Sequence, residues 1–428
     1  MRRSTDGRLA PRRRHAPVRA IASVVLAGAL ALTAAACTND EGGTPAWRGG
    51  KPEQKPKASA TITGPATDAK DVPASADITF TTKDAIDTTV ALKDSAGAAV
   101  VGKLSADGTW LPDKQLDYGT TYTATVTATG DDGKPAAVSN TFTTMAKPAN
   151  QVRVTSFLGD GQVVGVGMPL IVTFSRAIPE DYRDDVQRRM TVQATPAQEG
   201  VWRWTSPTEV HYRPKTFWKA NTTLAYKIQA GGLPMGDGWY GRADLTVDLK
   251  VGGALVMTVD NKTKKMTVTR NGKAVRTIPI SLGKPATPSS SGTMLVIEKL
   301  KKTVFDTRAD PNPANRYVTD IEFAQRLTWG GEFIHAAPWS VASQGRTNVS
   351  HGCVNMSTAN ATWLFNQTRI GDPIVVKGTE RKLKNGNGWT DWNMSWDEYV
   401  KGSAIPYRPP AADPTDEPSA EASATNAP

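Results

Sequence analysis

The sequence predicts a mainly β protein built from several domains, and three observations carry this prediction. The chain has 428 residues, more than the roughly 250 that one hydrophobic core usually serves. Short segments of alternating apolar and polar residues, separated by turn residues, recur from 58 to 377. Helical spacing of apolar residues is confined to two short stretches, 357–365 and 389–399. We therefore expect successive β domains with few helices.

The net charge of +10 originates mostly at the N-terminus. Residues 1–19 hold seven of the 51 basic residues and one of the 41 acidic residues, so 44 and 40 remain and the rest carries only +4. This balance argues against a nucleic-acid partner. Two cysteines exclude a disulfide scaffold and a cysteine-rich zinc module. A single long apolar run excludes a polytopic membrane protein.

The first 36 residues are typical of a secretory signal peptide. Basic residues precede the uncharged run 20–36, which ends in three alanines and is followed by Cys37. A cysteine directly after such small residues resembles a lipobox, where bacterial lipoproteins are cleaved and lipidated. The alternative is an uncleaved membrane anchor, because 17 residues reach the lower limit for a span. Both interpretations place the remainder outside the cytoplasmic membrane, anchored to its outer face.

Two consecutive stretches, 58–148 and 149–250, show the alternation typical of immunoglobulin-like β-sandwiches. They share a turn, because Gly119-Thr120-Thr121 and Asn221-Thr222-Thr223 open equivalent strands at an offset of 102 residues. Glycine and asparagine both tolerate a positive φ. We interpret the stretches as two tandem copies of one domain; the alternative is coincidence between β-rich segments. Nothing in either copy resembles a catalytic site, and we expect the lone His211 to be structural.

Residues 251–378 predict a third, β-rich domain with one helix. Asn271-Gly272 between two alternating segments indicates a type I′ hairpin. Ser357 is suited to cap a short helix that Gly371 would end, before a last strand at 373–377. This domain also contains the candidate catalytic residues.

The remaining segments flank these domains. Residues 37–57 are polar and rich in glycine and proline, which predicts a tether, and 407–428 have the composition of a disordered tail. Segment 379–406 predicts a short helical subdomain. Its aromatic residues follow one helical face and are expected to pack on a neighbouring domain; they are Trp389, Trp392, Trp396 and Tyr399.

Apart from Cys37 directly after the leader, Cys353 is the only cysteine of the chain, and His335 precedes it by 18 residues. This pairing predicts nucleophilic catalysis, in which an imidazole accepts the thiol proton and lowers the thiol pKa. Gly352 allows a tight backbone turn that would aim amides at a developing oxyanion. A backbone carbonyl would fix the tautomer of the histidine.

Two other interpretations of Cys353 remain. It could be a buried thiol with a packing role only, as many unpaired cysteines are. It could also ligate zinc together with His335 and His351, although catalytic zinc sites need three protein ligands and a second shell. We favour catalysis, and we predict no metal and no cofactor.

The spacing of these residues resembles a known family. His335, fourteen intervening residues and Ser350-His351-Gly352-Cys353 resemble the signature of L,D-transpeptidases of the YkuD type. The stretch from Gly283 to Thr293 and Asp391-Trp392-Asn393 are similar to that family as well. The resemblance covers 58–406 and implies two immunoglobulin-like domains, a YkuD-type catalytic domain and a short C-terminal helical subdomain.

The resemblance also implies an activity. Cys353 would attack peptidoglycan peptide stems at the third residue, release D-alanine and pass the acyl group to the side-chain amine of another stem, making a 3→3 cross-link. His335 would be the base, and amides of His351, Gly352 or Cys353 would bind the oxyanion. Relatives often carry serine where this chain has Ala336. Either the backbone carbonyl at that position suffices, or the hydroxyl matters and this enzyme is slower or uses Ser350 instead. Carbapenems become expected inhibitors. Residues implied to line the substrate groove are Tyr317, Gly330, Gly331, Trp339 and Asn355.

Two alternatives to transpeptidation stay open. The first is an L,D-carboxypeptidase, which forms the same acyl-enzyme and releases it to water. The second is a non-catalytic lipoprotein that binds the cell wall through its sandwiches. The intact pair of Cys353 and His335 argues against the second.

Overall fold

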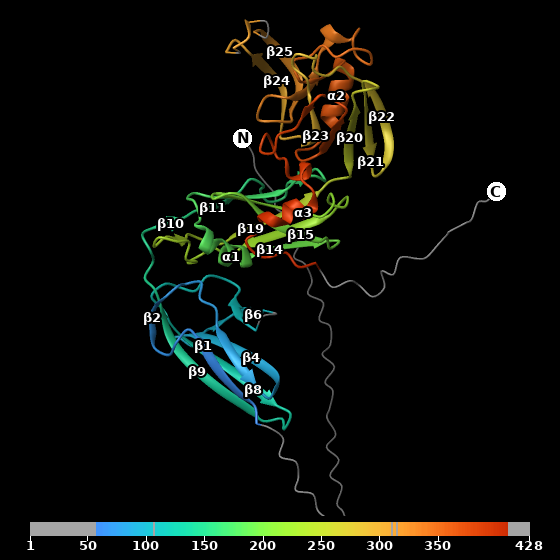
Figure 1. Cartoon of the computed structure of the whole chain (residues 1–428). Coiled ribbons are helices and arrows are strands. Elements are labelled where there is room, and N and C mark those ends of the chain that lie inside the picture. Colours follow the sequence, from blue (N-terminus) through green and yellow to red (C-terminus); the bar gives the residue numbers. More distant parts are fainter. Residues whose placement is uncertain (1–56, 106–107, 310, 314–315, 410–428) are drawn as a thin grey trace, which may run out of the picture. The chain divides into compact units, whose positions relative to one another are not determined.

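The computed structural model describes residues 57–105, 108–309, 311–313 and 316–409 (Figure 1). The predicted signal peptide, Cys37, all of the tether except residue 57, and the tail from 410 onward lie outside the described residues. Strands dominate the described part and its helices are short, which confirms the prediction of a mainly β protein. Within these ranges, no helix has the length and apolar character needed to cross a membrane.

The first group of strands forms a five-stranded sheet in the order β2-β9-β8-β4-β5, beside the two-stranded sheets β1-β3 and β6-β7. Every second residue of β8 is buried, as expected for a strand with one face on a core. That core contains Ile78, Leu92, Trp110 and Phe142. The strands are β1 (Ser59–Gly64), β2 (Ala69–Val72), β3 (Thr79–Lys83), β4 (Ala85–Asp94), β5 (Ala99–Val100), β6 (Gly102–Leu104), β7 (Trp110–Pro112), β8 (Thr121–Gly130) and β9 (Pro135–Thr144).

The second group contains two four-stranded sheets, β11-β13-β16-β15 and β12-β19-β17-β14, and the parallel pair β10-β18. It also contains the helix α1 (Glu180–Arg188), which sequence reasoning missed because Val186 is its one apolar side chain in the core. The available signal was the acidic first turn after Pro179. The strands are β10 (Gln151–Val152), β11 (Val154–Ser156), β12 (Val163–Val164), β13 (Leu170–Phe174), β14 (Met190–Thr195), β15 (Gly200–Ser206), β16 (Glu209–Pro214), β17 (Thr223–Ile228), β18 (Tyr240–Gly241) and β19 (Leu245–Val251).

The turn that the two groups were expected to share is present in both. Gly119 and Asn221 have φ values of +63° and +62°. The amide of Gly119 donates to the carbonyl of Met145 at 2.9 Å, and that of Asn221 to the carbonyl of Gly252 at 3.0 Å. A residue in the left-handed conformation thus lies two positions before β8 in one group and before β17 in the other.

The third group consists of a six-stranded sheet, β22-β21-β20-β28-β23-β29, and a four-stranded sheet, β24-β25-β26-β27. The long hairpin β24-β25 was not expected, because most residues of β24 are charged or polar and few are buried. The strands are β20 (Leu255–Asp260), β21 (Lys265–Arg270), β22 (Lys273–Pro279), β23 (Ser290–Leu295), β24 (Glu298–Asp306), β25 (Val318–Arg326), β26 (Phe333–Ala336), β27 (Val354–Met356), β28 (Pro373–Lys377) and β29 (Arg381–Lys382).

Two local predictions for this group are confirmed and one needs correction. Asn271 and Gly272 both have positive φ, 50° and 78°, as a type I′ turn requires. The side chain of Ser357 accepts a hydrogen bond from the amide of Asn360 and caps α2 (Thr358–Gln367). The helix ends at Gln367 and not at Gly371, which instead forms the turn before β28. A 3₁₀ turn, η2 (Pro338–Ser340), precedes the loop to β27.

The C-terminal segment contains short helices, as expected, but its aromatic residues do not lie on one helix, and that part of the prediction is wrong. The segment forms the 3₁₀ turn η3 (Asp391–Asn393), the short helix α3 (Trp396–Tyr399) and the 3₁₀ turn η4 (Val400–Gly402). Extended backbone at Met394 breaks the run, and Ser395 starts α3 as its cap. The packing prediction holds, since Trp392 donates to the carbonyl of Gly167 at 2.6 Å and its ring contacts Phe217 of the second group.

His211 is structural, as expected, and links β16 to this C-terminal segment. Its Nδ1 lies 2.9 Å from Asp391, and its Nε2 lies 3.0 Å from Glu209. The hydroxyl of Tyr399 donates to the carbonyl of His211 at 3.2 Å. Burial alone would lower the pKa of His211, but the carboxylates of Asp391 and Glu209 together outweigh burial and raise that pKa to about 9. A buried ion pair thus joins the second group of strands to the C-terminal segment.

The second and third groups also meet through backbone. The amide of Gly165 donates to the carbonyl of Ile370 at 2.7 Å, and that of Gly167 to the carbonyl of Gly371 at 2.9 Å. A side chain at position 165 has no room, because a Cβ there would lie 2.2 Å from the amide nitrogen of Asp372. The turn before β28 is therefore held by the second group.

The His211–Asp391 pair predicts a pH dependence of stability. We expect His211→Asn to destabilise the chain most below pH 6.5, where wild-type His211 is protonated in both states, and progressively less as pH rises through about 9. The pKa difference corresponds to at most about 3 kcal/mol. Urea unfolding of both proteins between pH 6 and 10, followed by tryptophan fluorescence, measures it. A difference that stays constant over this range would contradict the assignment.

The close contact between Gly165 and the turn before β28 predicts that a larger side chain at position 165 destabilises the chain. We expect Gly165→Ala to lower the free energy of unfolding by about 1–3 kcal/mol, because the added methyl group must displace Asp372. Gly159→Ala is the matched control, since a Cβ there meets its nearest atom only at 3.8 Å. Denaturant titration of both variants tests this. Equal free energies of unfolding for Gly165→Ala and Gly159→Ala would show that the contact between Gly165 and Asp372 accommodates the methyl group without strain.

Candidate active site

The pairing of β26 with β27 brings His335 and Cys353 together. These strands are parallel, with Ile334 opposite Val354 and His335 opposite Asn355. Cys353 directly precedes β27, so the alternation of side chains puts Cys353 on the same face as His335 and Asn355. The alternate residues Ile334 and Val354 are buried in the core on the other face. The alternation of core-facing and cavity-facing residues along β26 and β27 therefore places both reactive side chains on one surface.

That surface is hollowed into a cavity of about 340 Å³, and Cys353 and His335 both line it. A second cavity of about 410 Å³ also reaches Cys353 and extends to Gly330 and Gly331. The sulfur therefore lies where two cavities meet. The residues that line both are Phe305, Tyr317, His351 and Cys353.

His335 is buried and held by the backbone. Its Nδ1 lies 2.8 Å from the carbonyl oxygen of Ala336. A carbonyl can only accept, so Nδ1 carries the hydrogen and Nε2 keeps its lone pair. Burial lowers the pKa of His335 to about 4, although the Ala336 carbonyl partly opposes this shift. The residue is thus a neutral imidazole with one basic nitrogen, and alanine at 336 fulfils the orienting role through its backbone.

The expectation that the histidine lowers the thiol pKa is wrong for this structure. Burial raises the pKa of Cys353 to about 12; contact with the Phe333 backbone opposes this and the charge of Glu332 adds to it. The physical reason is that His335 is itself neutral and offers no positive charge. The thiol instead points to the carbonyl of Gly331, 3.8 Å from the sulfur. The resting pair is a thiol beside a neutral base.

Ser350 and Gly352 shape the turn before the sulfur. The hydroxyl of Ser350 donates to the carbonyl of Cys353 at 2.7 Å and accepts from the amide of Gly352 at 3.1 Å. Ser350 is therefore committed to this turn and does not orient His335. Gly352 has φ +129°, a conformation that side chains rarely adopt. Its amide is engaged by Ser350 and is therefore not available to bind an oxyanion.

His351 is exposed and lines both cavities. Its Nε2 is 3.0 Å from the ammonium nitrogen of Lys284, and its ring is 5.2 Å from that of Tyr317. Lys284 was missed by sequence reasoning, although it follows the predicted Gly283. Its amide donates to the carbonyl of Ser350 at 2.9 Å, which ties the loop to the motif.

The residues implied to bind substrate divide between the two cavities. Trp339 and Asn355 line the first, Gly330 and Gly331 the second, and Tyr317 both. The indole of Trp339 is 60% exposed, which leaves its face available to a ligand. Asn355 is buried, and its Oδ1 has no hydrogen-bond partner among the described residues. A substrate N–H could satisfy this oxygen.

Part of the cavity wall had no counterpart in the sequence analysis. The unexpected hairpin β24-β25 contributes it, and its position over the sheet depends on long-range pairing, so the signature motif gives no sign of it. The residues it supplies are Phe305, Thr319 and Ile321.

The zinc interpretation of this site lacks geometric support. Throughout the ranges that the structure describes, no three His, Cys, Asp or Glu side chains gather as a metal ion would require. His335 has already committed Nδ1 to a backbone carbonyl. The arrangement is suited instead to proton transfer from a thiol to the other imidazole nitrogen.

Comparisons with known proteins agree with this geometry. Residues 69–234 match the bacterial Ig domain family, and residues 255–376 match the L,D-transpeptidase catalytic domain, YkuD. L,D-transpeptidase 2 of Mycobacterium tuberculosis (strain CDC 1551 / Oshkosh) is 34% identical over 354 residues, which are 82% of this chain and 85% of the relative. L,D-transpeptidase 5 of Mycobacterium tuberculosis (strain ATCC 25618 / H37Rv) is 35% identical over 85% of this chain and 80% of its own length.

A solved structure of LD transpeptidase LdtMt1 in complex with imipenem is 34% identical. It covers 54% of this chain and 100% of its own, with a TM-score of 0.47. The two curated relatives are matched over most of their length, and the second family match contains both His335 and Cys353. The chain therefore belongs to the L,D-transpeptidase family.

Proposed function

We propose that Cys353 is the nucleophile and His335 the general base of a peptidoglycan L,D-transpeptidase. The observation that carries this assignment is the placement of a buried thiol and a neutral imidazole on one face of the β26-β27 pair, within one cavity. The fixed tautomer leaves Nε2 of His335 as the proton acceptor. A cysteine–histidine pair of this kind performs acyl transfer through a thioester.

The first half of the reaction acylates the enzyme. The sulfur of Cys353 attacks the carbonyl carbon of the third stem residue while its proton passes to Nε2 of His335. The amides of His351 and Cys353 stabilise the oxyanion. Collapse of the tetrahedral intermediate breaks the peptide bond to D-alanine, and His335 returns its proton to the departing amine. The product is a thioester on Cys353 and free D-alanine.

The second half transfers the acyl group. The side-chain amine of a second stem attacks the thioester carbonyl, and His335 accepts a proton from that amine. The carbon–sulfur bond breaks, and the proton returns to Cys353, which regenerates the thiol. A 3→3 cross-link results. The junction of two cavities at the sulfur supports this assignment over an L,D-carboxypeptidase, because donor and acceptor stems can approach from different sides.

The cavity residues receive roles within this proposal. Trp339, with its exposed indole, and Asn355, with its unsatisfied Oδ1, would hold the donor stem in the first cavity. Gly330 and Gly331 give the second cavity a wall without side chains, which suits a long acceptor stem. Carbapenems would acylate Cys353 by the same attack, because the strained lactam carbonyl replaces the stem carbonyl.

The proposal extends to the location and domain organisation of the chain. Its substrate lies outside the cytoplasm, in line with the leader 1–36 and with lipid attachment at Cys37. The segments 58–148 and 149–250 would then act as immunoglobulin-like spacers between the tether 37–57 and the catalytic domain 251–378, with 379–406 as the C-terminal subdomain. Mass spectrometry of the mature protein, which identifies its first residue and any attached lipid, tests the anchor.

The nucleophile assignment predicts the behaviour of Cys353→Ala. We expect this variant to lose D-alanine release from stem peptides, cross-linking when an acceptor amine is supplied, and covalent mass gain with a carbapenem. Wild type should form cross-linked product with acceptor present and little hydrolysed stem. Intact-mass analysis and product chromatography measure all three. A carbapenem adduct on the variant would refute the assignment, and hydrolysed stem as the main wild-type product would favour the carboxypeptidase.

The neutral resting pair predicts a flat pH profile. The pKa values of His335, about 4, and Cys353, about 12, both lie outside the range from pH 5 to 9. We therefore expect the rate constant of carbapenem acylation to stay nearly constant over that range and to fall only near pH 4, where His335 is protonated. Stopped-flow measurements with free cysteine as the reference test this, because free cysteine reacts faster as pH rises toward its pKa. An enzyme inflection near neutral pH would indicate a thiolate–imidazolium pair.

A further inference from the structure

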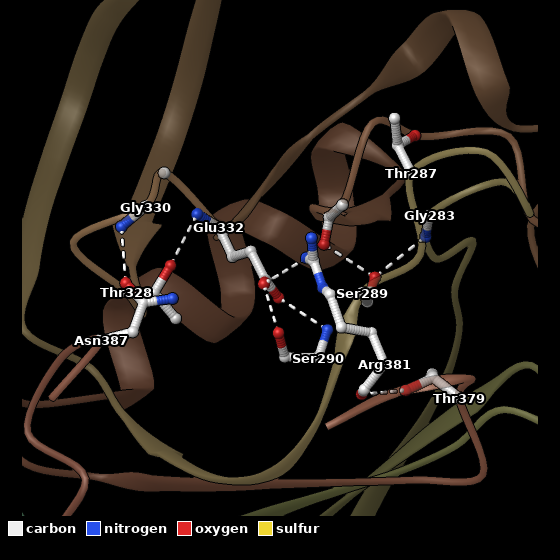
Figure 2. Close-up of polar contacts among 12 residues, drawn as sticks. Gly283, Thr287, Ser289, Ser290, Thr328, Gly330, Glu332, Thr379, Arg381 and Asn387 are labelled. Atoms are coloured by element: carbon white, nitrogen blue, oxygen red, sulfur yellow. Dashed lines mark hydrogen bonds and ion pairs between the residues drawn. The ribbon is translucent and has the colours of Figure 1, made fainter. Parts of the chain in front are cut away.

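The loop between β25 and β26 faces the sulfur and is anchored by residues that the proposed reaction does not use. The carbonyl of Gly331 in this loop lies 3.8 Å from the sulfur of Cys353. The amide of Glu332 donates to the hydroxyl of Thr328 at 3.0 Å, and the amide of Gly330 donates to Oδ1 of Asn387 at 2.8 Å (Figure 2). The loop is thus fixed both internally and from the C-terminal segment.

The strongest anchor is the buried carboxylate of Glu332. One oxygen accepts from the hydroxyl of Ser290 at 2.7 Å and from the guanidinium of Arg381 at 2.6 Å, and the other accepts from the amide of Ser290 at 3.0 Å (Figure 2). Ser290 and Arg381 are also opposite each other in the β23-β29 pair. A buried charge needs such partners, and removal of one leaves the other uncompensated. The ion pair therefore joins β23, β29 and the loop.

The same pair faces the residue before the nucleophile. A Cβ on Gly352 would lie 3.6 Å from a guanidinium nitrogen of Arg381 and 3.7 Å from Cγ of Glu332. The hydroxyl of Ser289 donates to the carbonyl of Gly352 at 2.7 Å. Ser289 thus holds the backbone directly before Cys353, and the next residue, Ser290, holds the carboxylate of Glu332. The ion pair therefore lies close to the turn that carries the nucleophile.

We propose that Glu332 and Arg381 are positioning residues for acyl transfer. Through the Gly331 carbonyl and the Gly352 turn, they fix where the sulfur and its neighbouring amides lie. Neither side chain lines the cavities at Cys353 or contacts the reacting atoms. This inference rests on the proposed function, because the placement of Cys353 matters only if it is the nucleophile.

The pair has two separable effects on Cys353. Displacement of the turn by about 1 Å would slow the chemical step on the order of 100-fold without weakening substrate binding. The charges act on the thiol in opposite directions: the carboxylate of Glu332 disfavours the thiolate, and the guanidinium of Arg381 favours it. A residue with only a packing role would produce neither the kinetic pattern nor this reversal of sign.

The experiment compares Glu332→Gln, Arg381→Ala and Arg381→Lys in the full chain. Arg176→Ala is the matched control, because Arg176 likewise pairs with a carboxylate, that of Asp237, and has a side chain 43% exposed against 44% for Arg381. We expect kcat for D-alanine release to fall at least about 10-fold in the first two variants, with KM within about twofold of wild type. Arg381→Lys should recover most of kcat, and the control should match wild type.

Alkylation of Cys353 by iodoacetamide at pH 8 gives the second readout. The thiol should be alkylated faster in Glu332→Gln than in wild type and more slowly in Arg381→Ala, although both variants have a lower kcat for D-alanine release. If Glu332→Gln fails to fold, Ser290→Ala replaces it, since it removes one donor to the carboxylate and should lower kcat in the same direction.

The outcomes separate the two proposals. An unchanged kcat, a rise in KM alone, or alkylation rates that move the same way in both variants would show that the pair is merely structural. The same conclusion would follow if Arg381→Lys failed to restore kcat and the variants that lose kcat also had lower melting temperatures. Retained D-alanine release in Cys353→Ala would overturn the proposed function itself. If Cys353→Ala loses D-alanine release while Glu332→Gln and Arg381→Ala keep the wild-type kcat, only the positioning role is overturned.

Discussion

The parallel register of β26 and β27 is the constraint on which the site depends. It places His335 and Asn355 opposite each other and sets Cys353 on their face, while Ile334 and Val354 enter the core. Slipping one strand by a single residue would send its reactive side chain into the core and an aliphatic side chain into the cavity. The core therefore specifies the register, and the active site uses the face that the core does not need.

Burial then decides the protonation states on that face. A low-dielectric site disfavours any charge without a partner, so the thiol keeps its proton and the imidazole stays neutral. The Ala336 carbonyl selects the tautomer that leaves Nε2 basic. Charge consequently has to develop during the attack, where fixed backbone amides stabilise it. A buried, neutral pair also protects an unpaired cysteine from oxidation, which requires the thiolate.

The C-terminal segment connects this chemistry with the second group of strands. Asp391 forms a buried ion pair with His211, and Trp392 packs against Phe217. A few residues earlier, Arg381 and Asn387 hold the loop that faces Cys353. One short segment thus fixes the loop beside the nucleophile while anchored to β16. Its irregular backbone allows it to contact both the loop and β16, because a continuous helix would place its side chains only at the regular spacing of a helix.

The sequence by itself determined the features that short-range patterns encode. The His335–Cys353 signature, the type I′ turn at Asn271 and the Ser357 cap depend on neighbouring residues, and the structure contains them. Tertiary structure alone decided the rest: the hairpin β24-β25, the break at Met394, the commitment of Ser350 to its turn, and the raised pKa of Cys353. These depend on burial and on partners distant in the chain. The Glu332–Arg381 pair, 49 residues apart, is the clearest case, because no local pattern marks either residue.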